Sequence, residues 1–172
     1  QNVMVNVFKK MVDNGLSDWL FLVCIGLQDE DKTEFEKLQK IAEGYPIKFL
    51  INLPNIKLWD IYSKAKIYWH ASGFGEDLVK HPEYAEHFGI SPVEAMGAGA
   101  VPVVINAGGQ KEIVEDNKSG YLCNNIEDFM FRTTTLIKDE NLLKKMSISS
   151  VRRSDIFSGN RFCNELKKII NE

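Results

Sequence analysis

Hydrophobic residues recur at two spacings along the chain, and their order predicts strands and helices in alternation. The unbroken apolar segment 19–25 and the β-branched segment 101–105 are typical of strands buried on both faces. Strand and helix alternation of this kind predicts an α/β fold, a Rossmann-like parallel sheet with helices on both faces. The other predicted elements are strands at 47–51, 67–69 and 120–122, helices within 4–12, 35–42, 58–65 and 112–116, and a mostly helical chain from residue 126 onward.

Length, composition and charge limit the class of protein. The chain has 172 residues, 44% hydrophobic content and a net charge of −3, which suits one α/β domain over residues 1–172. The charge gives no basic excess for nucleic acid binding, and no apolar run approaches the length of a membrane span. Gln1 begins directly in a helical pattern without a starting Met, so we expect a fragment of a longer chain.

The cysteines and histidines do not predict a metal site. The three cysteines are odd in number and far apart, which fits neither a zinc motif nor a disulfide framework, so we expect them to pack in the core. The histidines lack paired acids at ligand spacing. His70 ends an apolar strand, where it is either a buried, hydrogen-bonded histidine or a residue that lines a cleft, and we favour the first. The cysteines are Cys24, Cys123 and Cys163.

The segment 86–94 is the most informative part of the chain because two carboxylates, Glu86 and Glu94, bracket a glycine and a helix start. Ser91 followed by Glu94 has the spacing of a capping box, with Pro92 at the first helical position. Capping therefore explains Glu94 without a ligand, and Glu86 alone is explained as a solvated loop acid. A helix N-terminus also attracts phosphate, and carboxylates accept hydrogen bonds from sugar hydroxyls. The combination suggests a nucleotide-sugar site.

Two flanking segments bear on the same site. Residues 72–90 form a long connection with little regular pattern, and loops of this length are usually functional or disordered. We expect this loop to lie over the site and to close on a ligand. Downstream, Gly108-Gly109 either form a small anion nest or make a plain turn from strand to helix, and we favour the turn.

The motif resembles the donor-binding signature of the family 4 retaining glycosyltransferases, also called group 1 glycosyltransferases, which have the GT-B fold. The resemblance rests on residues 86–90, 94–96, 99, 101–104, 108–109, 112–114 and 120–122. It implies that the chain is the C-terminal, nucleotide-sugar-binding half of a GT-B enzyme. The first strand of that half and the N-terminal acceptor domain would lie before Gln1, and the isolated fragment would bind donor weakly and transfer nothing.

The resemblance also implies roles for individual residues. Glu86 matches the acid beside the donor sugar and is the expected catalytic residue, and Glu94 matches the acid that holds the ribose hydroxyls. The N–H groups of residues 88–90 would face the sugar and the pyrophosphate, and the turn at Leu53 would line the base. The complete set of expected donor-binding residues is Glu94, His87, Phe88, Gly89, Ile90, Ser91 and Leu53. His87 is expected as a polar loop histidine and not as a catalytic one.

The function implied by the resemblance is retaining transfer of a hexose from a nucleotide-diphosphate sugar to an acceptor such as a glycan or a lipid-linked saccharide. The donor, a UDP- or GDP-hexose, is a substrate, and no cofactor, metal or nucleic acid is expected. We expect a cytoplasmic protein, including the cytoplasmic face of a membrane, with peripheral membrane contact in the full-length form. The alternative is a non-catalytic nucleotide or sugar-phosphate binding module of the same fold, because fold alone does not decide function.

Overall fold

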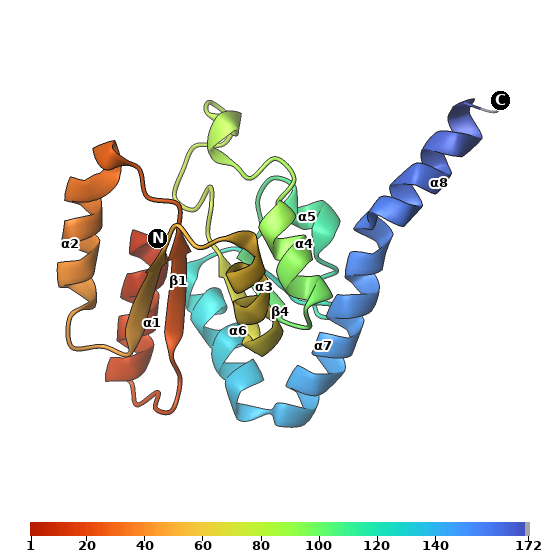
Figure 1. Ribbon diagram of the computed structural model, residues 1–172. Coiled ribbons are helices and arrows are strands. Elements are labelled where there is room, and N and C mark those ends of the chain that lie inside the picture. Colours follow the sequence, from red (N-terminus) through yellow and green to blue (C-terminus); the bar gives the residue numbers. More distant parts are fainter. Residues whose placement is uncertain (171–172) are drawn as a thin grey trace. The chain divides into compact units, whose positions relative to one another are not determined.

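The computed structural model describes residues 1–170 and contains two compact units, Gln1–Ile61 and the chain from Tyr62 onward. Each unit has its own parallel sheet, and the helix α3 (Asn55–Lys64) crosses the boundary between them (Figure 1). The α/β class and the parallel arrangement of strands confirm the fold predicted from the hydrophobic pattern.

The first unit has a two-stranded parallel sheet, in which Phe21 pairs with Ile47 and Ile25 with Ile51. Its buried core consists of Val5, Leu38 and Ala42 from two helices packed against Val23 of the sheet. The elements are α1 (Asn2–Asp13), β1 (Phe21–Ile25), η1 (Asp29–Asp31), α2 (Lys32–Ala42) and β2 (Ile47–Ile51).

The expectation that the strand within 19–25 is buried on both faces is wrong. Val23 points into the core, whereas the next residue, Cys24, is exposed. Successive side chains of a strand point to opposite faces. The helices α1 and α2 both contribute to the core on the Val23 side, so an apolar sequence runs through a strand that they cover on one face.

The second unit has a three-stranded parallel sheet with the order β3-β4-β5. Its central strand, β4, is buried at all five positions, as its β-branched sequence predicts. The strands are β3 (Ile67–His70), β4 (Val101–Ile105) and β5 (Tyr121–Cys123). The helices are η2 (Pro82–Tyr84), α4 (Ile90–Gly97), α5 (Gln110–Ile113), α6 (Ile126–Lys138), α7 (Glu140–Ser154), η3 (Asp155–Phe157) and α8 (Gly159–Ile170).

Helices cover both faces of this second sheet. On one face Met96 of α4 and Ile113 of α5 pack with Val104. On the other face the Trp69 ring packs edge-on against the Phe129 ring of α6, with 5.0 Å between the ring centroids. Trp69 Nε1 also donates a hydrogen bond to Thr133 Oγ1 at 3.1 Å. The predicted arrangement of helices on both faces of a parallel sheet is therefore confirmed in this unit.

A proline at the second position of the buried strand β4 is accommodated by a glycine beside it. Val101 N–H donates to Lys66 C=O at 3.0 Å, so the nitrogen of Pro102 faces the opposite neighbour, β5. β5 begins only opposite Val103, and therefore no ladder bond is lost. A Cβ on Gly120 would come within 2.5 Å of the Pro102 ring and carbonyl oxygen. Proline fits here because residue 120 has no side chain.

Serine side chains of α7 fasten the turn that leads into β4. Ser147 Oγ donates to Gly99 C=O at 2.6 Å, and Ser150 Oγ donates to Ala100 C=O at 2.8 Å. Ser150 and Ala100 are both buried. These bonds satisfy main-chain carbonyls that follow the C-terminus of α4, where no helical partner is present.

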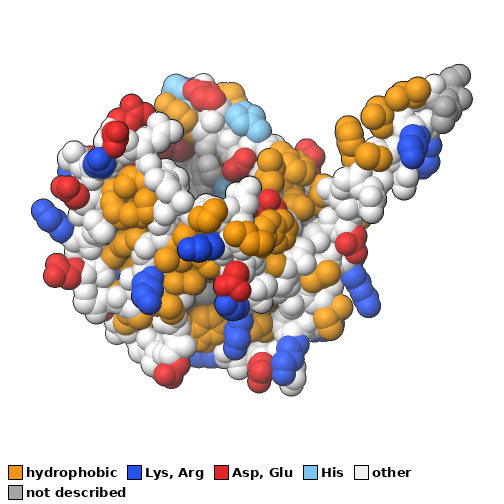
Figure 2. All heavy atoms as spheres, viewed as in Figure 1, with side chains coloured by type: hydrophobic (Ala, Val, Ile, Leu, Met, Phe, Trp, Pro, Cys, Tyr) orange, Lys and Arg blue, Asp and Glu red, His pale blue; other side chains and the backbone are white. Residues whose placement is uncertain are grey.

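The last helix, α8, carries apolar side chains that are exposed along its length, as Figure 2 shows for the helix that extends away from the rest of its unit. These side chains are Phe162, Leu166, Ile169 and Ile170. Cys163 on this helix is exposed as well, so of the three cysteines that were expected in the core only Cys123 is buried. Within residues 1–170, no helix combines the length and the apolar composition needed to cross a bilayer.

Candidate functional site

The predicted site residues of the second unit gather at the carboxyl edge of its sheet. β3 ends at His70 and β4 ends at Ile105, and the chain after each strand forms loops that lead into α4 and α5. In open α/β sheets ligands bind beyond this edge. The strand-to-helix connection that contains Glu86 therefore lies where the topology predicts a binding site.

The loop between β3 and α4 is compact. Within it, the two ends of the segment 72–84 are joined by a hydrogen bond of 3.4 Å from Ser72 Oγ to Tyr84 C=O, and this segment contains the short helix η2. His81 Nδ1 lies 3.1 Å from Glu83 Oε1. The rings of His81 and Tyr84 stack, with 5.2 Å between their centroids. A loop with close ends and internal side-chain packing is typical of an Ω-loop, a class that is frequently functional. Its closure on a ligand stays a prediction.

The helix α4 begins earlier than the capping-box spacing predicts. Its N-cap is Gly89, with φ 95°, and Val93 N–H closes the first turn onto Gly89 C=O. Ser91 is therefore already inside the helix, and Glu94 lies beyond the third helical position. The capping box is wrong because the left-handed conformation of Gly89, which glycine adopts without strain, turns the chain into the helix two residues sooner. Capping no longer explains Glu94.

The start of α4 has main-chain N–H groups that make no main-chain hydrogen bond among the described residues. Within residues 1–170, the N–H groups of Phe88, Gly89, Ile90 and Ser91 have no main-chain partner, and the following Pro92 has no N–H. The Glu94 carboxylate, one turn further on, likewise has no hydrogen bond or ion pair with any described residue. Free donors at the positive end of a helix dipole attract an anion.

Glu86 is held by a histidine from the adjacent strand. His70 Nε2 lies 3.2 Å from Glu86 Oε2, with the two side chains 16% and 32% exposed. The other ring nitrogen, His70 Nδ1, lies 3.4 Å from Gln110 Nε2, and Gln110 is 1% exposed. Burial lowers the pKa of His70, and the neighbouring Glu86 carboxylate opposes this shift. The hydrogen bonding expected for His70 is present, but its side chain is partly and not fully buried.

Tyr68 links the start of α4 to His70. Its hydroxyl oxygen is 2.8 Å from Ser91 Oγ. Its ring stacks on the His70 ring, with 6.4 Å between the ring centroids. Burial raises the pKa of Tyr68, the Ser91 hydrogen bond opposes the rise, and the negative charges of Glu86 and Glu94 add to it. Tyr68 thus contacts the histidine partner of Glu86 on one side and the first turn of α4 on the other.

The double glycine after β4 supports the Glu86 segment directly. Gly109 N–H donates to Glu86 C=O at 2.7 Å, which favours a turn over an anion nest because this N–H is already occupied. A Cβ on Gly108, which has φ 52°, would overlap the Glu86 carbonyl oxygen, and a Cβ on Gly109 would come within 2.8 Å of Phe88 Cα. The two segments approach this closely because neither glycine has a side chain.

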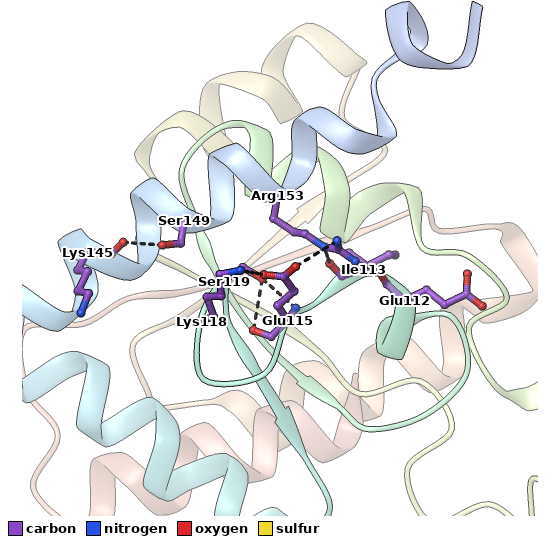
Figure 3. Close-up of polar contacts among 8 residues, drawn as sticks. All are labelled: Glu112, Ile113, Glu115, Lys118, Ser119, Lys145, Ser149 and Arg153. Atoms are coloured by element: carbon purple, nitrogen blue, oxygen red, sulfur yellow. Dashed lines mark hydrogen bonds and ion pairs between the residues drawn. The ribbon is translucent and has the colours of Figure 1, made fainter. Parts of the chain in front are cut away.

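The short helix α5, which follows the double glycine, is secured from α7. Arg153 Nε donates to Ile113 C=O at 2.9 Å, its second terminal nitrogen donates to Glu112 C=O, and Nη1 lies 3.4 Å from Glu115 Oε1 (Figure 3). The guanidinium thus occupies the carbonyls at the C-terminus of α5, the end of a helix that favours a cation. Arg153 fixes the helix that carries Gln110.

We expect Arg153→Ala to lower the free energy of unfolding by about 2 kcal/mol, because two main-chain carbonyls lose a charged donor. Thermal or urea unfolding of the chain measures the effect. Arg152→Ala is the matched control, since Arg152 is the exposed neighbour on the same helix, and it should change stability by no more than about 0.5 kcal/mol. Equal effects of the two substitutions would contradict the role given to Arg153.

The remaining predicted residues fall into two groups. His87, Phe88 and Ile90 are exposed, and the Phe88 ring meets the Phe157 ring edge-on at 5.7 Å. Leu53 belongs to the first unit, where it follows Asn52 in the turn after β2. Asn52 has φ 49° and its side chain bonds both to the N–H of Leu27 at 2.8 Å and to the C=O of Leu27 at 3.1 Å. The roles of these residues toward a donor stay predictions.

Sequence reasoning did not include His70 or Gln110 among the site residues. His70 lies 16 positions before Glu86, and only the fold brings the two together. The available signal was a histidine at the carboxyl end of a strand, followed by the loop that carries an acid. In the described part of the chain, no group of three or more His, Cys, Asp or Glu side chains is arranged to hold a metal ion.

Comparison with known proteins agrees with this geometry. Residues 1–152 match the family model described as glycosyl transferases group 1. The chain belongs to this family. Its fold is that of a GT-B glycosyltransferase domain, which confirms the resemblance noted in the segment 86–94.

Group 1 relatives include mannosyltransferases. The chain is 40% identical over 97 residues to the alpha-1,3/1,6-mannosyltransferase ALG2 of Dictyostelium discoideum, a match that covers 55% of this chain and 23% of that protein. It is 29% identical over 157 residues to the GDP-Man:Man(3)GlcNAc(2)-PP-Dol alpha-1,2-mannosyltransferase of the same organism, covering 86% of this chain and 29% of that protein. The chain thus spans about a quarter of the length of these curated relatives.

A solved structure shows the same fold at low sequence identity. Alr3699/HepE of Anabaena, in complex with UDP and glucose, superposes with a TM-score of 0.78 at 17% identity, covering 99% of this chain and 44% of that one. At this identity the likeness establishes the arrangement of helices and strands. The match extends over less than half of that chain.

Proposed function

We propose that this group 1 domain binds a nucleotide-diphosphate sugar and forms the donor site of a retaining hexosyltransferase. The observation that carries the proposal is the set of N–H groups at the start of α4 that have no main-chain partner among the described residues, with the unpartnered Glu94 carboxylate one turn further on. A sugar nucleotide carries both hydroxyl groups and a diphosphate, so it satisfies acceptors and donors of this kind together. A site for a simple anion would gain nothing from the acid.

The proposed donor pose assigns one part of the ligand to each group. The diphosphate lies at the N–H groups of residues 88–91, where the helix dipole favours negative charge. The ribose hydroxyls donate to Glu94, whose carboxylate has no partner among the described residues. The hexose hydroxyls donate to Glu86, whose Oε2 is already engaged with His70.

The chemistry of transfer follows from this pose. The bond from the anomeric carbon to the diphosphate oxygen breaks, the acceptor hydroxyl oxygen bonds to that carbon on the same face, and the acceptor proton passes to the departing diphosphate. Negative charge grows on the leaving group while the sugar becomes cation-like. The N–H groups at α4 would stabilise the first charge and the Glu86 carboxylate the second.

The relatives make mannose the first sugar to test. One matching relative is named as an enzyme that uses GDP-Man and a dolichol-linked acceptor, and another as a mannosyltransferase. We therefore propose GDP-mannose as the donor and a lipid-linked glycan as the acceptor. Binding of the acceptor would need residues outside this chain, because the relatives are about four times as long.

The test is calorimetric titration of GDP, GDP-mannose, UDP and UDP-glucose into the wild-type chain and into Glu94→Gln. We expect a guanine nucleotide to bind the wild type and Glu94→Gln to weaken its affinity by about tenfold, because the charged acceptor of two ribose hydroxyls is lost. The melting temperature should stay close to that of the wild type, since Glu94 has no cap bond to lose.

Glu127→Gln is the matched control, because it removes a carboxylate from the first turn of α6 in the same unit. It should leave nucleotide affinity unchanged. Wild-type affinity in Glu94→Gln would remove Glu94 from the site. Failure of the wild-type chain to bind any of the four ligands would overturn the proposed function.

A further inference from the structure

A chain of three side chains, Gln110, His70 and Glu86, joins three segments of the second unit. Gln110 opens α5, His70 ends β3, and Glu86 belongs to the loop before α4. The two links measure 3.4 Å from Gln110 Nε2 to His70 Nδ1 and 3.2 Å from His70 Nε2 to Glu86 Oε2. The imidazole therefore lies between an amide and a carboxylate, with both of its nitrogens engaged.

The chemistry of the two neighbours determines where the imidazole proton lies. A carboxylate only accepts hydrogen bonds, so His70 Nε2 must carry a hydrogen toward Glu86. The amide nitrogen of Gln110 only donates, so His70 Nδ1 must accept. Both requirements are met by one species, the neutral imidazole protonated at Nε2. Burial, which lowers the pKa of His70, favours the same neutral form.

The alternative species requires a different amide orientation. An imidazolium would donate from both nitrogens, and Gln110 would then have to turn its Oε1 toward Nδ1. In the observed orientation Oε1 is buried and has no hydrogen-bond partner in the described part of the chain. This orientation leaves one buried acceptor unsatisfied, and turning the amide over would bring a hydrogen bond from His70 Nδ1 to Oε1 only if that nitrogen carried a proton.

Close packing keeps this chain of contacts in place. A Cβ on Gly89 would lie 3.0 Å from Gln110 Nε2, so the amide sits against the main chain at the start of α4. The Tyr68 ring stacks on the imidazole from the same strand. Gly109 N–H holds the Glu86 carbonyl at 2.7 Å, which limits movement of the acid away from His70. The carboxylate of Glu86 is therefore directed by its neighbours.

We propose that His70 is a positioning residue for Glu86, with Gln110 selecting the Nε2–H tautomer that orients the carboxylate toward the donor sugar. The inference rests on the proposed function, in which Glu86 faces the hexose. His70 occupies Glu86 Oε2 and leaves Oε1 for a sugar hydroxyl. His70 acts through Glu86, so its loss should weaken recognition of the sugar while binding of the nucleotide persists.

The test compares two substitutions at one position with two ligands. His70→Gln keeps an N–H donor near the place of Nε2, whereas His70→Phe keeps a ring of similar size and removes the donor. Calorimetry with GDP and GDP-mannose measures the factor by which the mannose improves affinity. We expect His70→Phe to reduce this factor by about tenfold, as for loss of a hydrogen bond to a charged group, and His70→Gln to restore most of it.

Nitrogen chemical shifts of His70 in the free chain provide a second readout that needs no ligand. The wild type should show the neutral Nε2–H tautomer. Gln110→Leu, which removes the amide donor, should allow a mixture of the two neutral tautomers. An Nδ1–H tautomer or an imidazolium at neutral pH in the wild type would overturn the positioning role, whatever the chain binds.

The two proposals fail in different ways. If the wild type binds GDP-mannose and His70→Phe weakens GDP and GDP-mannose equally, His70 has a structural role and the inference is wrong while the proposed function stands. If His70→Gln and His70→Phe are equally defective toward the sugar, the donor hydrogen is not what matters and the inference is again wrong. If the wild type binds neither ligand, the proposed function falls and the positioning role falls with it.

Discussion

Replacing Gly109 by alanine is expected to destabilise the second unit by about 3 kcal/mol and to remove the contribution of the sugar to donor affinity. The added Cβ would overlap the main chain at His87 and Phe88, and backbone atoms cannot turn aside as a flexible side chain does. Gly109 itself has helical angles, φ −65° and ψ −13°, so alanine meets no conformational penalty there. The expected effect therefore comes entirely from the displaced Glu86 segment.

Urea unfolding and calorimetry with GDP and GDP-mannose measure the two effects in the same variant. Gly159→Ala is the matched control, because a Cβ at the start of α8 would meet no other atom within 4 Å in the described structure and the position lacks a positive φ. It should leave both stability and affinity close to the wild type. A Gly109→Ala variant with wild-type stability would show that the two loops are not packed as described.

Glu86→Gln is expected to lower the rate of sugar transfer by about 10²- to 10³-fold while the melting temperature stays within about 2 °C of the wild type. The carboxamide oxygen still accepts the hydrogen bond from His70 Nε2, so the fold keeps the contact. The negative charge beside the proposed cation-like sugar is lost. Transfer from GDP-mannose has to be measured in a two-domain enzyme that contains this chain.

Glu83→Gln serves as the control because Glu83 lies on the same loop and its carboxylate contacts only the exposed His81 among the described residues. Its transfer rate should equal that of the wild type. Near-normal transfer by Glu86→Gln together with a large loss of melting temperature would make Glu86 a structural acid. Glu86→Ala is the less informative variant, since it also removes the acceptor of the His70 hydrogen bond.

Periodicity predicted most of the elements because each has a strong hydrophobic signal. The five β-branched and proline residues of β4 and the apolar positions of α6 lie in the predicted elements, and the alternation of the two types predicted the parallel sheets. It did not predict the exposure of Cys24, because an apolar run has the same sequence whether one or two faces of the strand are covered.

The two acids of the candidate site could be proposed from the sequence, but their neighbours could not. Glu86 and Glu94 stand at a local spacing, and local spacing can be recognised in a sequence. The contact of His70 with Glu86 depends on a loop that returns to the edge of the sheet, and that of Gln110 depends on close approach across two glycines. The start of α4 was misplaced because a left-handed glycine leaves no sequence signal distinct from an ordinary turn.

The contact of Pro102 with Gly120 has a consequence for how this sequence can change over evolutionary time. The proline ring and its carbonyl oxygen fill the space that any side chain at position 120 would need. The carbonyl oxygen belongs to the main chain, so it stays in place whichever residue occupies position 102. Replacing the proline alone therefore does not admit a larger residue at 120, and position 120 is expected to stay glycine even where residue 102 changes.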